Sequence, residues 1–217
     1  MIEGMRSSCR RQDLLPQAGS LELTGNVPTD DDRQLLLTRV WVRATSDVEA
    51  LVNLLDTETD PDLRWAAVTR LVSLGEDVGA VDAELSRDPQ GVDKAAGARS
   101  AAPTADAKRT ALDALLQDSD RRAYELYAIA ENVWQVGQEA LCAPFVEQWF
   151  AEIGATAGFR DGWALAQVAR RSFPVVVAAP ETLAMAEQTL AATTDDRLRR
   201  ELSDGTDLLR RVLHTAG

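Results

Sequence analysis

The sequence predicts an all-α protein, and three observations support this prediction. Apolar residues recur at spacings of three and four from Asp30 to the C terminus, which is the period of an amphipathic α-helix. Short polar residues, prolines and glycines interrupt the pattern where helices would begin or end. The β-branched run over residues 173–177 contains Pro174 and is followed by Pro180. Because proline does not fit inside a sheet, we predict a buried connection there and not a strand.

The first two helices are predicted from acidic and hydroxyl residues at their starts. Residues 29–32, Thr-Asp-Asp-Asp, place polar caps and negative charge at the first helix, where both stabilise free N–H groups. Ser46 or Asp47 can cap the second helix. The apolar residues that follow at helical spacing are Leu36, Val40 and Trp41 in the first helix, and Val48, Leu51, Val52 and Leu55 in the second.

The third helix has the clearest boundaries. Asp60 is a good N-cap, and Pro61 suits the first helical position, where its missing N–H costs nothing. Gly75 is a natural C-terminal stop, because glycine readily adopts the left-handed conformation that ends many helices. One apolar face joins the two ends and consists of Leu63, Ala67, Leu71 and Leu74.

Eight further helices are predicted from the same signals. Residues 88–91, Asp-Pro-Gln-Gly, end one helix, Thr104 can cap the next but one, and Gly137 separates two more. The predicted helices cover residues 77–86, 92–101, 107–118, 123–134, 141–154, 158–171, 181–192 and 196–214. Short links between helices of this length favour a solenoid of antiparallel helix pairs, each pair occupying roughly 30–35 residues. A globular bundle is the alternative, because no residue-level repeat is visible.

Composition excludes several classes of partner. The 217 residues can bury roughly 70% of their unfolded surface, so neither disulfides nor metals are needed for a core. A formal charge of −12 disfavours nucleic acid and anionic membranes, which are bound by clustered Lys and Arg. The N-terminal residues lack the apolar core of a signal peptide, and no apolar run approaches the roughly 20 residues of a membrane span. We expect a cytoplasmic protein.

Catalytic residues are scarce. His214, three residues from the C terminus, is the only histidine, so a His-Glu-x-x-His zinc helix cannot be built. A Ser-His-Asp or Cys-His arrangement would depend on this terminal residue, which we interpret as solvated. Cys9 and Cys142 have no metal-ligand spacing, and Cys142 lies in an apolar helical pattern that predicts a buried thiol.

Several other residues have a structural and a functional interpretation. Asp30–Asp32 and Asp195–Asp196 could bind a cation, but solvated helix N-termini are favoured because no calcium loop follows. An arginine cluster could grip a peptide carboxylate or an acidic partner, although a solvated charged face is favoured. The cluster consists of Arg197, Arg199, Arg200, Arg210 and Arg211. Four tryptophans on apolar stripes are interpreted as core: Trp65, Trp134, Trp149 and Trp163. We assign no catalytic, cofactor-binding or metal-binding residue.

Five sequence segments resemble a known family, in the same order along the chain. They are DPDLRW (residues 60–65), VSLG (72–75), VDAELSRDP (81–89), AAPTADAK (101–108) and QEALCAPFVEQWF (138–150). These resemble the C-terminal α-helical domain of the aminopeptidase N family of zinc metallopeptidases, of the actinobacterial, endoplasmic-reticulum-aminopeptidase-like type. Residues 180–183 and 198–200 also fit, so the resemblance covers about residues 27–213.

The resemblance implies a fold and a role. The family's complete domain is a bowl of HEAT-like helices that closes over the zinc domain and encloses a chamber for short peptides. Arg64 and Arg170 are candidates for the concave surface, where the family receives peptide, and the spacing leaves both undecided. The predicted domains are an irregular or poorly ordered N-terminal segment, residues 1–26, and a HEAT-like repeat domain, residues 27–217.

Several motifs of the family are missing from this sequence, and their absence leads us to expect a non-catalytic role. The zinc-binding motif, its distant glutamate ligand and the Gly-x-Met-Glu-Asn substrate motif are absent from this sequence. The helical domain is expected to start partway through the family's, so its N-terminal end is truncated. We expect a non-catalytic domain that packs on a separate zinc-peptidase domain, with the zinc held there. The alternatives are a free-standing scaffold that self-associates or recruits another protein, and an autonomous enzyme.

Overall fold

The computed structural model describes residues 31–76, 79–160 and 162–216, and these residues form helices and connections without a β-strand. The all-α prediction is confirmed. The helices are α1 (Asp31–Ala44), α2 (Val48–Thr57), α3 (Pro61–Ser73), α4 (Ala80–Arg87), α5 (Val92–Ser100), α6 (Ala105–Leu116), α7 (Ala123–Asn132), α8 (Glu139–Glu152), the 3₁₀ helix η3 (Ile153–Gly158), α9 (Gly162–Arg171), α10 (Pro180–Ala192) and α11 (Asp196–Ala216).

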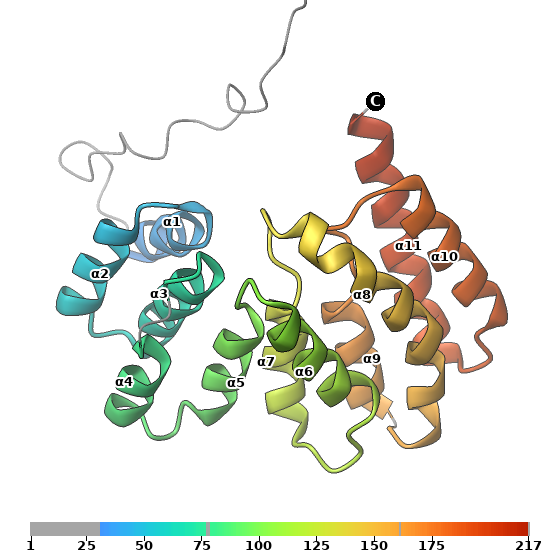
Figure 1. Ribbon diagram of the computed structural model, residues 1–217, viewed down its shortest axis with the longest axis horizontal. Coiled ribbons are helices and arrows are strands. Elements are labelled where there is room, and N and C mark those ends of the chain that lie inside the picture. Colours follow the sequence, from blue (N-terminus) through green and yellow to red (C-terminus); the bar gives the residue numbers. More distant parts are fainter. Residues whose placement is uncertain (1–30, 77–78, 161, 217) are drawn as a thin grey trace, which may run out of the picture.

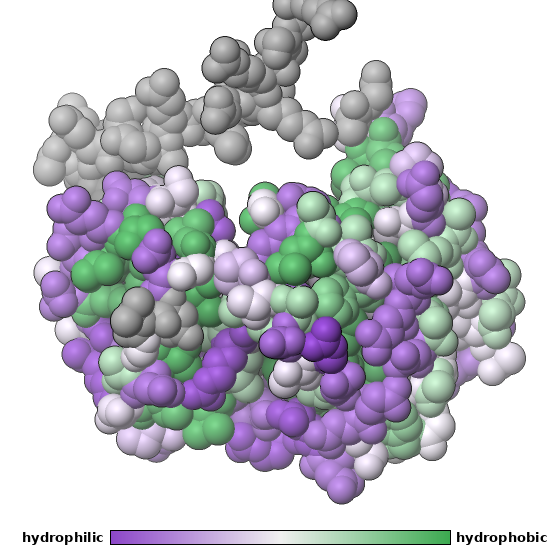
Figure 2. Space-filling view, in the orientation of Figure 1, coloured by the Kyte–Doolittle hydropathy of each residue, from purple (hydrophilic) through white to green (hydrophobic). Residues whose placement is uncertain are grey.

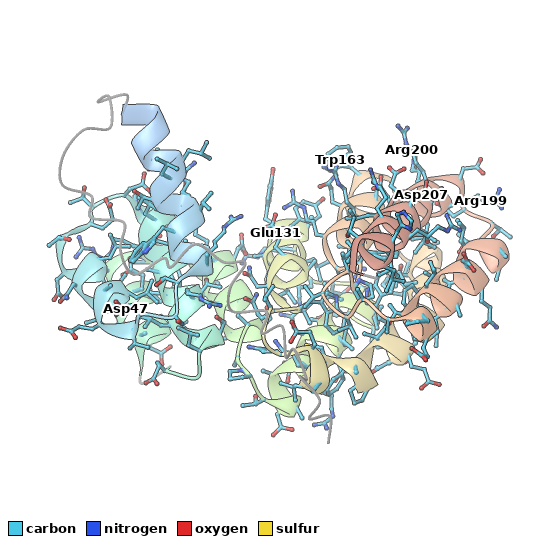
Figure 3. The ribbon with its side chains drawn as sticks, turned by 90° about the horizontal axis from the view of Figure 1, so that it is seen from above. Asp47, Glu131, Trp163, Arg199, Arg200 and Asp207 are labelled. Atoms are coloured by element: carbon cyan, nitrogen blue, oxygen red, sulfur yellow. The ribbon has the colours of Figure 1, made fainter. Side chains whose placement is uncertain are left out.

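The helices lie in two layers that follow the order of the chain (Figure 1). In one layer each odd-numbered helix packs on the next, from α1 and α3 through α5, α7 and α9 to α11. In the other, α6 packs on α8 and α8 on α10, while α2 and α4 pack on α3. Seen from above, the layers curve into an arc with α1 and α11 at its two ends, and the odd-numbered helices face its open side (Figure 3). The helices therefore pack side by side in the order in which they follow one another along the chain.

The predicted caps are confirmed where the structure describes them. The carboxylate of Asp60 accepts a hydrogen bond from the N–H of Leu63 at 2.9 Å, and Pro61 occupies the first helical position of α3. Asp47 caps α2 in the same way. At the other end of α3, Gly75 has a φ of +89°. The N–H of Gly75 bonds to Val72 and that of Glu76 to Leu71, which is the Schellman arrangement.

Two predicted helix starts are wrong. The helix predicted from residue 77 begins at Ala80, and residues 77 and 78 lie outside the described part. The helix predicted from residue 158 begins at Gly162, and residues 153–158 form the 3₁₀ helix η3 instead. Gly162 has a φ of +50°, so an α-helix cannot pass through it from Gly158. Residues 173–177 form turns, and the predicted connection is confirmed.

The buried apolar side chains form three clusters. The largest joins α6 to α11 and is centred on Trp149, whose ring makes edge-to-face contacts with Phe150 and Phe173 at centroid distances of 5.0 and 5.6 Å. A second cluster joins α3, α4 and α5, and a third joins α1, α2 and α3. Among the described residues, no helix combines the length and the apolar character that crossing a membrane requires. On the face drawn in Figure 2, hydrophilic and hydrophobic residues alternate over small areas.

Candidate functional site in the groove between α9 and α11

A groove in the odd-numbered layer lies between α9 and α11. The two helices run in the same direction, because Gly162 at the start of α9 approaches Arg197 in the first turn of α11. Further along, Phe173, just beyond α9, lies against Gly205 in the middle of α11. The groove between them has a volume of about 540 Å³. Its place in the layer puts it on the open side of the arc (Figure 3).

The walls of the groove come from one face of each helix. On α9, Trp163, Gln167 and Arg170 share a face at spacings of four and three, while the opposite face is buried in the core. On α11, the polar face of the helix forms the second wall. The residues of this wall are Arg200, Glu201, Asp204, Gly205, Leu208 and Arg211, and Phe173 and Val175 complete the lining.

Three guanidinium groups line this groove, and few of the described residues engage them. Arg170 and Arg200 are exposed and form no ion pair or hydrogen bond within the described residues. Arg211 donates only to the backbone oxygen of Asp207, at 3.3 Å. A free guanidinium can bind a carboxylate through two parallel hydrogen bonds. Two carboxylates, Glu201 and Asp204, line the same groove and can accept from a ligand's N–H groups.

The interpretation of Trp163 as a core residue is wrong. Its side chain is 72% exposed, at the rim of the groove. The buried side of α9 consists of Leu165, Val168 and Ala169, and Trp163 lies on the other side with Arg170. The sequence places Trp163 four residues before Gln167 and seven before Arg170, but this spacing does not decide exposure, because Gln167 on the same face is buried. An exposed indole beside arginines offers a flat apolar surface and a hydrogen-bond donor to a ligand.

The other three tryptophans are confirmed as core. Trp65, Trp134 and Trp149 are at most 7% exposed. The indole N–H of Trp134 donates to the backbone oxygen of Ser172 at 2.6 Å, and that of Trp149 donates to the Ser172 hydroxyl at 2.9 Å. Each ring therefore fills the core without leaving a buried donor unpaired.

The structure separates the two arginines considered for the concave surface. Arg170 lines the groove. Arg64 is buried instead, and its guanidinium makes a two-point contact with Glu84 at 2.8 and 2.5 Å. Arg64 also donates to the backbone oxygens of Leu55 and Glu58. Arg64 therefore joins α2, α3 and α4, and the candidate role at a peptide surface is wrong for this residue.

The arginine cluster of α11 is also divided by the structure. Arg200 and Arg211 line the groove. Arg199 donates to the backbone oxygen of Thr193, and Arg210 pairs with Glu187 of α10 at 2.9 Å. Figure 3 shows Arg200 on the groove side of α11 and Arg199 on the other side. Arg199 and Arg210 thus have structural roles, and Arg197 is exposed.

The remaining candidates behave as ordinary structural groups. Asp195 caps α11 by accepting from the N–H groups of Arg197 and Leu198 at 3.0 and 2.9 Å. His214 is exposed in the last turn of α11. Cys142 is a buried free thiol, as predicted. Asp30, the side chains of Asp31 and Asp32, and Cys9 lie outside the described residues.

A buried polar cluster lies where α3, α5, α6 and α8 meet, and sequence reasoning missed it. Lys108 is fully buried and donates to the backbone oxygen of Ser100 at 2.9 Å. Burial lowers the pKa of Lys108 to about 8, and burial raises the pKa of the nearby Cys142 thiol. The amide nitrogen of Gln138 donates to Ser73 and Ala101, both at 2.9 Å. The sequence held a signal for this burial, because Lys108 stands three, four and seven residues before the buried Ala111, Leu112 and Leu115 on one helix face.

Neither the groove nor the described buried cluster contains a histidine. Within residues 31–76, 79–160 and 162–216, no group of three or more His, Cys, Asp or Glu side chains is placed to hold a metal ion. The residues present therefore do not fit a catalytic zinc, which needs three protein ligands. The geometry of the groove suits recognition of a charged, partly apolar ligand.

Comparison with known proteins agrees with this fold. Residues 26–211 match the family described as ERAP1-like C-terminal domain. The chain is also 30% identical to Aminopeptidase N of Streptomyces lividans over 196 residues, which cover 84% of this chain and 23% of that protein. The chain thus spans about a quarter of the length of this relative. Since the match covers nearly all the described helices, this chain belongs to the ERAP1-like C-terminal domain family.

Proposed function

We propose that this chain is a non-catalytic helical domain that packs on a zinc-peptidase catalytic domain and closes its peptide chamber. The family membership over residues 26–211 carries the proposal. The name of the Streptomyces relative, Aminopeptidase N, supports a peptidase context. In this proposal the zinc belongs to the separate catalytic domain, the helices form a HEAT-like solenoid, and the protein is cytoplasmic.

The groove between α9 and α11 is the part of this domain that we expect to contact peptide. It lies on the open side of the arc, where a catalytic domain would face it. The free guanidinium groups of Arg170 and Arg200 can bind a peptide's carboxylates, and Trp163 can stack on its apolar side chains. Both interactions would position peptide without taking part in the hydrolysis.

A reconstitution experiment tests the proposal. The chain would be mixed with a Streptomyces Aminopeptidase N from which the matching region has been removed. We expect the two proteins to bind and the hydrolysis of an aminoacyl-arylamide to change. Absence of both binding and any change in hydrolysis would contradict the proposal. Tight self-association of the chain in that case would favour the alternative of a free-standing scaffold.

A pair of variants separates the groove from general electrostatics. Arg170→Ala/Arg200→Ala removes two positive charges from the groove. Arg87→Ala/Arg109→Ala removes the same charge from α4 and α6, outside the groove. We expect only the groove variant to raise the KM for longer peptides in the reconstituted enzyme, with the KM for the arylamide unchanged in both. Equal effects of the two variants would show that the groove does not contact peptide.

A further inference from the structure

The two ends of the odd-numbered layer differ in polarity. At the α11 end, the outward side carries charged groups that pair with neighbours, as Arg210 does with Glu187 and Asp207. At the α1 end, the side facing away from α3 exposes Leu36, Leu37 and Val40, with exposed fractions of 62, 48 and 58%. Helical-repeat domains need a polar cap at each end. The exposed face of α1, defined by these three residues, lacks one among the described residues.

The opposite side of α1 is well packed. Val42 is fully buried, and Leu35 and Trp41 pack with it against the cluster formed with α2 and α3. Leu36, Leu37 and Val40 lie on the opposite side of the helix. A surface of three neighbouring apolar side chains is small, so a short segment is enough to cover it.

We propose that residues 20–24 of this same chain, Ser-Leu-Glu-Leu-Thr, cover the exposed face of α1. A second copy of the chain is a poorer occupant, because a stable interface uses roughly 20–30 residues from each partner. A segment that is part of the same chain binds at a high effective concentration, about millimolar for a short linker. A small apolar surface is sufficient for such a segment.

The chain length permits this contact. Seven residues, 24–30, separate Leu23 from the start of α1, and they can span roughly 23–25 Å when extended. Val40 lies about 14 Å along α1 from its first residue, at 1.5 Å per residue. The segment can therefore turn back and reach the middle of the helix. Leu21 and Leu23 supply the apolar side chains.

Charge also favours this segment. Arg43 is exposed on α1 and makes no ion pair within the described residues. Residues 20–24 contain one charged residue, Glu22, of opposite sign. An ion pair between Glu22 and Arg43 would orient the segment on α1, while Leu21 and Leu23 provide most of the contact.

Hydrogen exchange of the full-length chain tests the proposal. Leu21→Asp/Leu23→Asp would remove the apolar contact, and Ser20→Asp/Thr24→Asp adds the same charge while keeping both leucines. We expect amide exchange in residues 35–44 to become at least fivefold faster in the leucine variant and to be unchanged in the control. No change in the leucine variant, or an equal change in both, would overturn the proposal. Far-UV circular dichroism would confirm that each variant is folded.

A disulfide experiment identifies the occupant directly. In a Cys9→Ser background, Leu23→Cys/Val40→Cys places one thiol in the segment and one on α1. Mild oxidation is expected to give a disulfide within one chain and a protein that stays monomeric by light scattering. A disulfide between two chains would show that a second copy covers the face. Two unreacted thiols would show that the segment does not reach it, and either result overturns the proposal.

Discussion

At the scale of single residues, the described part of the chain buries four charged side chains, which are Arg64, Glu84, Lys108 and Arg160. Burying a charge is expensive unless it is paired, and Arg64 and Lys108 illustrate the two cases. Arg64 is paired with Glu84 and has two further backbone acceptors. Lys108 has one acceptor, the backbone oxygen of Ser100, and its pKa is lowered to about 8 by burial. Arg64 is therefore compensated, whereas Lys108 is held at a cost that depends on pH.

The stability of the protein should rise with pH because of Lys108. The pKa of its amine is 10.5 in the unfolded chain and about 8 in the fold, so between these values the unfolded state binds more protons. The free energy of unfolding then increases with pH, by about 2 kcal/mol between pH 7 and 9.5. Urea titrations of the wild type and of Lys108→Met at both pH values would measure this. The raised pKa of Cys142 acts in the opposite direction in both proteins, so parallel pH dependence in the two would contradict the prediction.

The pair of Arg64 and Glu84 should matter more than an exposed pair on the same helix. Glu84→Gln leaves the buried guanidinium without its counter-charge, and a loss of about 3 kcal/mol is expected. Asp82→Asn is the control, because Asp82 pairs with Arg99 at an exposed site of α4, where the loss should stay below about 1 kcal/mol. Urea denaturation at pH 7 compares them. Similar losses of unfolding free energy in the two variants would show that burial does not make the ion pair of Arg64 and Glu84 more stabilising than an exposed one.

At the scale of elements, the contact between α5 and α7 depends on the absence of a side chain. A Cβ added at Gly97 would lie 2.7 Å from the backbone oxygen of Ala128. The hydroxyl of Ser100 reaches the backbone oxygen of Ile129 at 3.3 Å in the same contact. Glycine costs about 1 kcal/mol in a helix interior, but here it allows two helix backbones to approach closely. The contact in turn holds the middle of the arc together.

Gly97→Ala should therefore destabilise the protein although alanine favours helices. Overpacking costs about 1–3 kcal/mol and the gain in helix propensity is about 1 kcal/mol, so we expect a net loss of up to about 2 kcal/mol. Gly154→Ala in η3 is the control, because its added Cβ would meet nothing within 4 Å. Thermal unfolding would rank the two variants. A melting temperature for Gly97→Ala at or above that of the wild type would mean that α5 and α7 separate easily.

At the scale of the whole molecule, the three apolar clusters are joined by a few polar contacts. The amide of Gln138 connects the C-terminal ends of α3 and α5 to the start of α8, since it donates to Ser73 and Ala101. Exposed ion pairs such as Lys94 with Asp62 and Arg122 with Asp93 also join neighbouring helices, but each contributes little. Gln138 thus provides a buried polar connection from the start of α8 to α3 and α5.

Gln138→Leu should weaken the contact of α8 with α3 and α5. Two backbone oxygens would lose their buried donor, and we expect a loss of about 2–4 kcal/mol at about 1–2 kcal/mol for each. Hydrogen exchange should accelerate in both α3 and α5. Gln148→Leu on α8 is the control, because the side chain of Gln148 has no hydrogen bond to any described residue and is only half-buried. Acceleration confined to α8 in the Gln138 variant would contradict this coupling role.

Helix existence and helix caps could be predicted from the sequence because they depend on neighbouring residues. Asp60 and Pro61 start α3, and Gly75 ends it, through hydrogen bonds that span at most five residues. The groove could not be predicted in the same way. It combines Trp163 and Arg170 with Arg200 and Arg211, which come from two helices some 40 residues apart. Only the parallel packing of α9 and α11 brings these residues together.

The sequence by itself determined the all-α class, the ordered family segments and the absence of a zinc-binding motif. The tertiary structure decided which face of each helix is covered. Trp149 and Trp163 both lie on helices at apolar spacing, yet one is fully buried and the other 72% exposed. Helical spacing gives the angle between residues around one axis, whereas burial depends on where the neighbouring helix lies. For the same reason Arg64 pairs inside the protein, and Arg170 remains free in the groove.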